Sequence, residues 1–376
     1  RVDDFNNNFE KKTFGEIVRS ISTRMYIKSV VSDLGEYEVI QQGDTPILGY
    51  SNDQPFEKYK SVILFGDHTL SLYRPKAPFL LATDGIKILQ STILKRDYLY
   101  YLTQNYIPKS QGYKRHYSVL KQVFVNYSRD SSEQSAIGSF FRTLDNLLTS
   151  YKDNLTNYQS LKATMLSKMF PKAGQTVPEI RLDGFEGEWE KSKLKDVAHR
   201  VQGNDGRMDL PTLTISASGG WMNQIDRFSA NIAGKEQKNY TLLKKGELSY
   251  NHGNSKLAKY GVVFELQDYE EALVPKVYHS FRVNQLADAK FIEIMFSTKI
   301  PDRELGKLVS SGARMDGLLN ISFDDFMNIT IIIPTLEEQQ AVGAYFSNLD
   351  NLINSYQEKI TQLETLKKKL LQDMFI

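Results

Sequence analysis

The sequence contains no cysteine and only five histidines and two tryptophans in 376 residues. Disulfides and thiolate metal sites are therefore excluded, and the lack of cysteine fits a cytoplasmic protein. The histidines are scattered without metal-ligand spacing, so we expect no metal site. No run of 18 apolar residues occurs, so no membrane span and no membrane partner are expected.

Several motifs that carry chemistry are also missing. There is no phosphate-cradling Gly-Lys-Ser/Thr loop, no dinucleotide-binding glycine fingerprint, and no adenine-methylation motif of the Asn-Pro-Pro-Tyr type. The acidic residues Glu36, Glu38, Asp44 and Asp53 lack the spaced lysine or metal-ligand pattern that would mark a nuclease. We therefore expect that the chain has no catalytic residues, binds no cofactor and is not an enzyme by itself.

Neither positive nor negative charge is in large excess. The formal net charge is +2, with +4 in residues 1–130 and −1 in residues 171–336. Neither part is as basic as a typical non-specific DNA-binding domain. If the chain binds DNA, a local patch or a basic partner must supply much of the attraction to phosphate.

The chain does contain a long internal repeat. Residues 132–170 return without a gap as residues 337–375, with about 17 of 39 positions identical. A second repeat comes before each copy, because residues 1–5 match 181–185 and residues 9–11 match 189–191. Such repeats indicate a duplicated architecture in which two globular blocks share their ends and differ between them. The predicted division is a first globular domain over 1–130, a first spacer helix over 131–170, a linker over 171–188, a second globular domain over 189–335 and a second spacer helix over 336–376.

The globular blocks are expected to be mixed, so that the fold class is α+β. Residues 61–65 and 261–266 have the composition of strands. Residues 98–102 and 291–296 predict one short helix in each block. Thr335, followed three residues later by Glu338, predicts a capping box at the start of the second long helix.

The two long helices carry an apolar seam with heptad spacing, interrupted in each copy by one lysine, Lys162 or Lys367. The seam positions that we assign to helix pairing or partner binding are Leu144, Leu148, Tyr151, Leu155 and Tyr158 in the first copy and Leu349, Ile353, Tyr356, Ile360 and Leu363 in the second. Each helix could pack only on its own block. Pairing of the two copies in an antiparallel coiled coil, with pseudo-twofold symmetry, is favoured because each helix has a single matched partner in the chain.

Three loops combine cations, amides and aromatic residues around a glycine, as suits contact with phosphates or base edges. Two of them lie at matching places, before the last strand of each block. Each loop taken alone is better explained as a solvated surface turn, and the matching places of those two favour a binding role. The candidate DNA-binding residues are Lys109, Gln111, Tyr113, Lys114 and Arg115 in the first loop, Tyr250, Asn251, Lys256 and Lys259 in another, and Ser311 and Arg314 in the counterpart of the first.

The whole chain resembles the specificity subunits of Type I restriction-modification systems. The resemblance rests on residues 336–350, on their partial copy at 132–145, on the segment 185–190 with its copy at 5–10, and on the alternation of block and helix. The first copy departs from the pattern, with Ser131 and Ser132 where the second has Leu336 and Glu337, and Arg129 in place of Pro334.

The resemblance implies that each block is a target recognition domain for one half of a split site in double-stranded DNA. It implies that the paired helices set the gap between the half-sites and bind two methyltransferase subunits. These partners would hold S-adenosylmethionine and methylate adenine at N6. Two further motor-nuclease subunits, dependent on ATP and Mg, would add restriction of DNA in bacterial defence.

Two other interpretations stay open. The chain could be a non-catalytic scaffold whose coiled coil joins two protein-binding modules, although such a scaffold would keep its two blocks alike. It could also be an enzyme domain detached from a fused restriction-methylation polypeptide, with methylation or nuclease motifs before Arg1, which the pairing of Arg1 with Arg181 disfavours.

Overall fold

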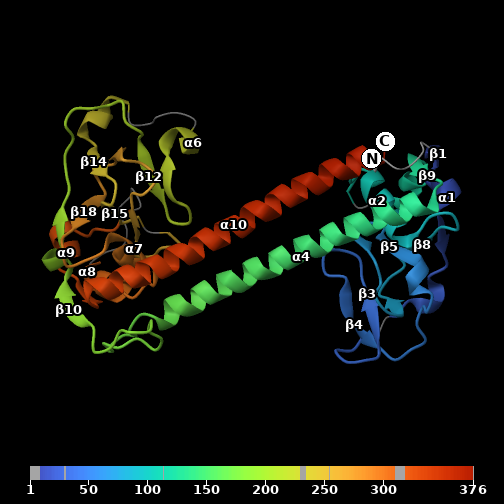
Figure 1. Cartoon of the computed structure of the whole chain (residues 1–376), viewed down its shortest axis with the longest axis horizontal. Coiled ribbons are helices and arrows are strands. Elements are labelled where there is room, and N and C mark those ends of the chain that lie inside the picture. Colours follow the sequence, from blue (N-terminus) through green and yellow to red (C-terminus); the bar gives the residue numbers. More distant parts are fainter. Residues whose placement is uncertain are drawn as a thin grey trace. The chain divides into compact units, whose positions relative to one another are not determined.

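The computed structural model describes residues 9–28, 31–112, 114–228, 234–253, 255–309 and 318–375. The chain forms two compact units (Figure 1). Unit 1 comprises Arg1–Asn154 and Tyr356–Ile376, and unit 2 comprises Leu155–Ser355. Each unit is a mixed α+β domain that also holds part of both long helices, α4 (Ser131–Lys168) and α10 (Leu336–Met374).

In both units the remaining α-helices and strands begin with a strand, a short helix and a strand, and end with helices and a last strand. Those of unit 1 are β1 (Phe9–Thr13), α1 (Phe14–Ile17), β2 (Arg19–Ile21), β3 (Tyr37–Ile40), β4 (Ile47–Ser51), β5 (Val62–Gly66), β6 (Leu72–Tyr73), β7 (Phe79–Leu81), β8 (Ile86–Gln90), α2 (Arg96–Tyr106), α3 (Tyr117–Leu120) and β9 (Phe124–Ser128). Those of unit 2 are β10 (Glu190–Lys193), α5 (Leu194–Val197), β11 (Ala198–Arg200), β12 (Leu213–Ser216), β13 (Gly220–Asn223), α6 (Gln224–Phe228), β14 (Thr241–Lys244), β15 (Leu248–Asn251), β16 (Val262–Glu265), β17 (Glu271–Val274), β18 (His279–Val283), α7 (Ala289–Ser297), α8 (Asp302–Leu308), α9 (Phe323–Met327) and β19 (Thr330–Ile333). The strands and short helices expected in each block are present.

The sheets show which parts of the units are equivalent. A four-stranded sheet has the order β2-β8-β5-β6 in unit 1 and β11-β18-β15-β16 in unit 2. The first and last strands of each unit pair antiparallel, β1 with β9 and β10 with β19. Between these shared parts the units differ, because unit 1 has a three-stranded sheet, β4-β3-β7, and unit 2 has two separate pairs, β12-β13 and β14-β17. We call the shared sheets and helices the frame.

A repeated glutamine fastens each long helix to its own unit. The Gln134 side chain accepts a hydrogen bond from the Lys95 amide (2.8 Å) and donates to Ser128 O (2.8 Å). Gln339 likewise accepts from the Asp288 amide (3.0 Å) and donates to Pro334 O (2.9 Å). Both glutamines are buried, and a buried amide needs such partners. The identity of these two positions in the repeat therefore has a structural cause.

The helix starts are capped differently from the sequence prediction. Asp130 caps α4 by accepting hydrogen bonds from the amides of Ser132 (2.6 Å) and Glu133 (3.2 Å). Thr335, at the same place in the second copy, accepts from the Glu338 amide at 3.4 Å. The expected capping box is wrong in its second half, because the Glu338 carboxylate pairs with Arg181 (2.6 Å) instead of returning to Thr335.

Both long helices pack on their own unit and on each other. Phe141 of α4 and Phe346 of α10 lie at 0% exposure in the cores of units 1 and 2 respectively. Phe375, the residue after α10, lies in the unit 1 core, and Met169, the residue after α4, lies in the unit 2 core. Pairing of the helices and packing on the blocks thus occur together.

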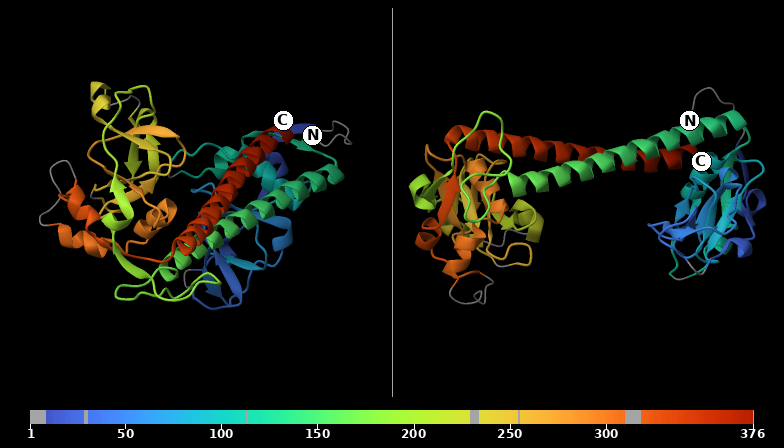
Figure 2. Two further views of the ribbon diagram at one scale, coloured as in Figure 1. Left: turned by 60° about the vertical axis from the view of Figure 1, so that its left-hand side comes forward. Right: turned by 90° about the horizontal axis from the view of Figure 1, so that it is seen from below.

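The two helices run antiparallel in the coiled coil (Figures 1 and 2). In unit 1, Asp145 contacts Lys367 (2.6 Å), whereas Tyr151, later in α4, contacts Tyr356, earlier in α10, with ring centroids 5.3 Å apart. The ten predicted seam residues are all buried or half-buried. The predicted antiparallel coiled coil is therefore confirmed.

Candidate nucleic-acid interface

The first candidate loop, residues 109–117, follows α2 in unit 1 and is held in shape by a buried histidine. His116 is at 0% exposure, and its Nε2 accepts a hydrogen bond from the Gln111 amide at 3.0 Å. The proton of the neutral ring is then on Nδ1, which donates to Asp67 O at 3.0 Å. The Asp67 carboxylate accepts from the Tyr117 amide at 2.7 Å, which fixes the far end of the loop.

The predicted cations of this loop face solvent. Lys109, Gln111, Lys114 and Arg115 are exposed. Arg115 pairs with Asp84 at 3.2 Å, but both side chains are more than 60% exposed, so the pair contributes little stability. These four side chains remain available for phosphates or base edges. Tyr113 lies outside the described residues.

The second candidate loop contains one residue that the prediction placed wrongly. Tyr250 is at 0% exposure, stacks on Phe326 with centroids 4.4 Å apart, and donates its hydroxyl to Tyr260 O at 2.7 Å. Burial raises the pKa of its hydroxyl. Tyr250 is therefore a core residue of β15, because alternate side chains of a strand point to opposite faces and this one points inward.

Asn251 is also engaged inside the protein. Its amide donates to Ile215 O at 3.2 Å and accepts from the Gly253 amide at 3.1 Å. Lys256 and Lys259, in contrast, are exposed, and the Lys259 ammonium lies 5.2 Å from the centre of the Tyr260 ring. Of the predicted residues in this loop, the two lysines have the exposure that contact with DNA requires.

The third candidate loop, with Ser311 and Arg314, lies outside the described residues. The chain that follows it is fastened by two histidines that the sequence analysis did not single out. His252 Nδ1 lies 2.8 Å from Leu319 O, and His279 Nε2 donates to Ile321 O at 2.9 Å. The rings stack with centroids 4.7 Å apart. Burial lowers the pKa of His279 to about 4. Nothing in the spacing of these histidines along the sequence indicates that they meet.

The lysine in each helical seam has a defined partner in the other helix. Lys162 of α4 pairs with Asp350 of α10, and Lys367 of α10 pairs with Asp145 of α4 at 2.6 Å. Asp145 also accepts hydrogen bonds from the Tyr101 hydroxyl (2.5 Å) and from Arg74 (3.1 Å). A charged pair in an otherwise apolar seam fixes helix register, because a shifted alignment would leave both charges unpaired.

The described part of the structure contains neither a metal-ligand cluster nor a membrane span. Among the residues that it describes, no group of three or more His, Asp or Glu side chains could hold a metal ion. No helix in the described ranges is long and apolar enough to cross a membrane.

Comparisons with known proteins agree with the geometry. Residues 186–365 match the family described as Type I restriction modification DNA specificity domain. The chain is similar to the Type I restriction enzyme MjaVIII specificity subunit of Methanocaldococcus jannaschii, with 22% identity over 313 residues that cover 78% of this chain and 72% of that protein. Its fold is similar to the S subunit of a Type-I restriction-modification system from M. genitalium, with a TM-score of 0.62 and 15% identity over 99% of this chain and 98% of that one. Residues 186–365 therefore form a Type I restriction modification DNA specificity domain, and the chain as a whole is similar in sequence to a Type I specificity subunit and in fold to a solved S subunit.

Proposed function

We propose that the chain reads a split site in double-stranded DNA, one half-site with each unit, and directs partner subunits to that site. The observation that carries this proposal is that the two units share the frame but differ in the additional sheets that the frame holds. The four-stranded sheets have the same order in both units, whereas the additional sheets differ. A protein that bound one partner twice would keep its two binding faces alike, whereas two different half-sites require two different faces.

The residues proposed for contact with DNA are those that the structure leaves exposed. In unit 1 these are Lys109, Gln111, Lys114 and Arg115, and in unit 2 they include Lys256 and Lys259. Lysine and arginine attract phosphates, and arginine and glutamine can also bind base edges in the major groove. Joining two readers in one chain makes the second binding event intramolecular, which raises overall affinity without additional contacts.

The partners are proposed to be two methyltransferase subunits that dock on the long helices. Exposed apolar side chains on these helices support this, since large apolar residues in water often mark protein interfaces. On α4 they are Phe140 (44% exposed), Leu147 (42%) and Leu161 (36%), at intervals of seven or fourteen residues, and on α10 Leu366 is 47% exposed.

In this proposal the chemistry belongs to the partners. The methyltransferases bind S-adenosylmethionine and methylate adenine at N6 in each half-site. Two motor-nuclease subunits with ATP and Mg add cleavage, and the complex works in the cytoplasm. The paired helices act as a spacer, and half-sites about one helical turn, roughly 10 bp, apart would present both to one face of the duplex.

The test is selection from a random duplex library with the chain copurified with its methyltransferase. We expect enrichment of two short half-sites across a fixed gap, with an adenine in each. The chain alone should enrich the same motif poorly, because the partners supply much of the phosphate attraction. A soluble complex that enriches no motif would overturn the proposal and favour the protein scaffold.

A matched variant assigns the half-sites. Replacing Lys109, Lys114 and Arg115 of unit 1 by alanine should relax or weaken one half-site and leave the other unchanged. Replacing Lys256 and Lys259 of unit 2 should affect the other half-site. Equal effects of either variant on both half-sites would show that these loops are not the readers.

A further inference from the structure

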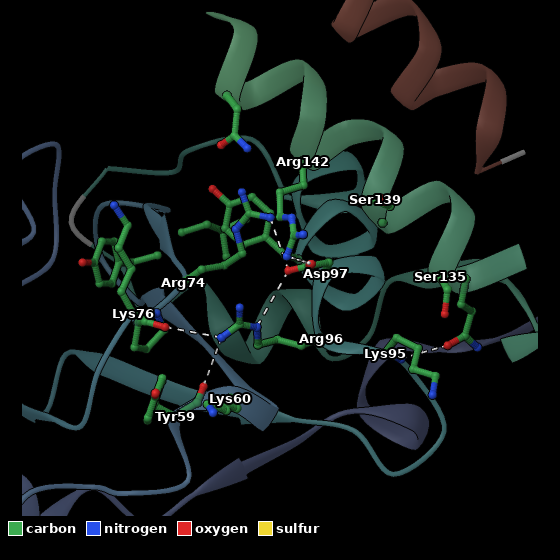
Figure 3. A pocket seen from close by; sticks show the side chains of 17 residues that line it. Tyr59, Lys60, Arg74, Lys76, Lys95, Arg96, Asp97, Ser135, Ser139 and Arg142 are labelled. Atoms are coloured by element: carbon green, nitrogen blue, oxygen red, sulfur yellow. Dashed lines mark hydrogen bonds and ion pairs between the residues drawn. The ribbon is translucent and has the colours of Figure 1, made fainter. Parts of the chain in front are cut away.

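Unit 1 contains a basic pocket between α2, α4 and the end of β6 that none of the predicted loops includes (Figure 3). Its volume is about 820 Å³. Six cations line it against a single carboxylate, that of Asp97. The six are Lys60, Arg74, Lys76, Lys95, Arg96 and Arg142. So high a density of positive charge repels itself unless an anion is bound.

Asp97 lies at the centre of the pocket and is shared by three guanidinium groups. Arg142 lies 3.3 Å from its carboxylate, Arg74 3.4 Å and Arg96 3.8 Å. Arg74 also pairs with Asp145, outside the lining, at 3.1 Å, but Asp145 is shared with Lys367. The three arginines therefore still outnumber the carboxylates that they contact, and each guanidinium has five N–H donors. Figure 3 shows Arg142 reaching from α4 toward Asp97 and Arg96, so that the arginines converge on one space.

The rim carries further cations that are not neutralised. Lys60, Lys76 and Lys95 are exposed, and in the described part of the chain no carboxylate pairs with them. With Asp97 as the only carboxylate of the lining, the pocket has a formal charge of +5. The whole chain has a net charge of only +2, so this pocket is a strong local concentration of its positive charge.

The shape of the pocket depends on small residues of α4. Ser135, Gly138 and Ser139 form its wall on the helix side. A Cβ on Gly138 would lie 3.0 Å from both Asp97 Cβ and the Tyr98 amide nitrogen, so the glycine allows α4 to approach α2 closely. This approach brings Arg142 within reach of Asp97.

Unit 2 shows that the frame does not require these cations. The matched bonds of Gln134 and Gln339 make Lys95 equivalent to Asp288, and Arg96 therefore equivalent to Ala289. The repeat places Ser347 at the position of Arg142. Three cations of unit 1 are thus replaced by an acid and two neutral residues on the same frame. A partner that docks in the same way on both units would need the same cations on both. The pocket of unit 1 is therefore built to bind something else.

Phosphate is the anion that this arrangement fits best. Guanidinium groups bind phosphate oxygens through paired, charge-assisted hydrogen bonds, and surrounding lysines add attraction without strict geometry. We propose that the basic pocket of unit 1 binds backbone phosphates of duplex DNA and anchors this unit to DNA independently of base sequence. The proposal rests on the DNA-recognition function proposed above and adds a second, non-reading contact to it.

The test uses Lys95→Asp combined with Arg142→Ser, which installs the residues of unit 2. Asp288 accepts a hydrogen bond from the Phe291 amide at 2.8 Å and so caps α7. An aspartate at position 95 should cap α2 in the same way, and the variant should fold. The matched control is Lys11→Asp on β1, an exposed lysine outside the pocket.

Affinity is measured by fluorescence anisotropy for a random-sequence duplex and for the selected site, over a range of salt concentrations, with the methyltransferase complex. Each lost phosphate contact should lower the slope of log affinity against log salt by about 0.9. We expect the double variant to bind both duplexes more weakly, roughly tenfold at moderate salt, with sequence preference unchanged. Lys11→Asp should bind like wild type. If the double variant does not fold, Lys60→Glu with Lys76→Glu, two exposed residues of the rim, replaces it.

Each other outcome has a distinct meaning. Wild-type complex that binds neither duplex would overturn the proposed function itself. Wild-type binding with an unchanged salt slope in the variant would overturn only the pocket. Loss of the methyltransferase on copurification, with DNA affinity retained, would show an acidic protein surface as the ligand. Tight calorimetric binding of inorganic phosphate or ATP without DNA would assign the pocket to a free phosphate compound.

Discussion

Lys367 of α10 and Asp145 of α4 form an ion pair of 2.6 Å, and Lys162 and Asp350 form the same pair with the helices exchanged. The lysine and the aspartate are 17 residues apart along each helix. Equal separations allow both pairs to form in one antiparallel alignment. A shift of either helix by one turn would break both.

The two pairs should differ in strength. Asp145 has three partners and its side chain is 21% exposed, whereas Asp350 is 37% exposed. Asp145→Asn should lower the free energy of unfolding by about 2 kcal/mol, because it leaves Lys367 and Arg74 short of an anion. Asp350→Asn should cost less than about 1 kcal/mol. Denaturant unfolding followed by circular dichroism compares them, and equal losses would contradict the central role of Asp145.

Arg181 and Glu338 form a buried, two-pronged pair in unit 2. Arg181 Nε and Nη2 donate to the two Glu338 oxygens at 2.8 and 2.6 Å, and Trp189 Nε1 donates at 3.3 Å. Glu338 is 1% exposed, so Arg181→Ala should cost about 3 kcal/mol by leaving a buried carboxylate without its cation.

Glu338→Gln is the control for this pair, since its single amide oxygen can still accept one of the two Arg181 donors, and the charge left without a partner is then that of Arg181, which is 16% exposed, and not a fully buried carboxylate. It should cost clearly less than Arg181→Ala in the same unfolding measurement. If the control is as damaging as Arg181→Ala, packing rather than charge explains the loss.

His279 should make unit 2 less stable in acid. Burial lowers its pKa to about 4, below the ordinary 6.5, so the folded state favours the neutral ring. The neutral ring of His279 contributes its full stabilisation above pH 6.5. This stabilisation is lost as the pH falls from about 6.5 to about 4, and the free energy of unfolding should drop by roughly 3 kcal/mol in total. His279→Gln, which can still donate to Ile321 O, should show a smaller loss over this range. Parallel pH profiles of the two proteins, obtained by thermal unfolding, would contradict the assignment.

The helices should act as a matched pair in setting the gap between half-sites. Deleting one heptad from both, residues 148–154 and 353–359, shortens both 17-residue separations by the same seven residues. It should shorten the tolerated gap by about 10 Å, roughly 3 bp. Deleting 148–154 alone makes the separations unequal and should destabilise one of the two ion pairs. Library selection measures the gap. The same gap after the paired deletion would rule out the spacer function.

The sequence by itself determined the repeats, the heptad seam and the α+β character of the blocks. These depend on local periodicity and on identity between copies, which can be read along a chain. The sequence also showed that Gln134 recurs as Gln339 and Lys162 as Lys367, but it did not show the hydrogen-bond and ion-pair partners of these side chains. Gln134 and Gln339 are repeated because each joins a helix to a loop and a strand of its own unit.

Only the tertiary structure decided which side chains face solvent and which residues distant in sequence meet. Tyr250 lies in a segment rich in polar residues, yet the sheet turns it into the core beside Phe326. The basic pocket brings Lys60, Arg74, Arg96 and Arg142 together from four segments, and each of these segments alone has an ordinary charge. The burial of a side chain and the meeting of distant cations both depend on contacts between residues far apart in the chain. The local sequence pattern therefore cannot predict them.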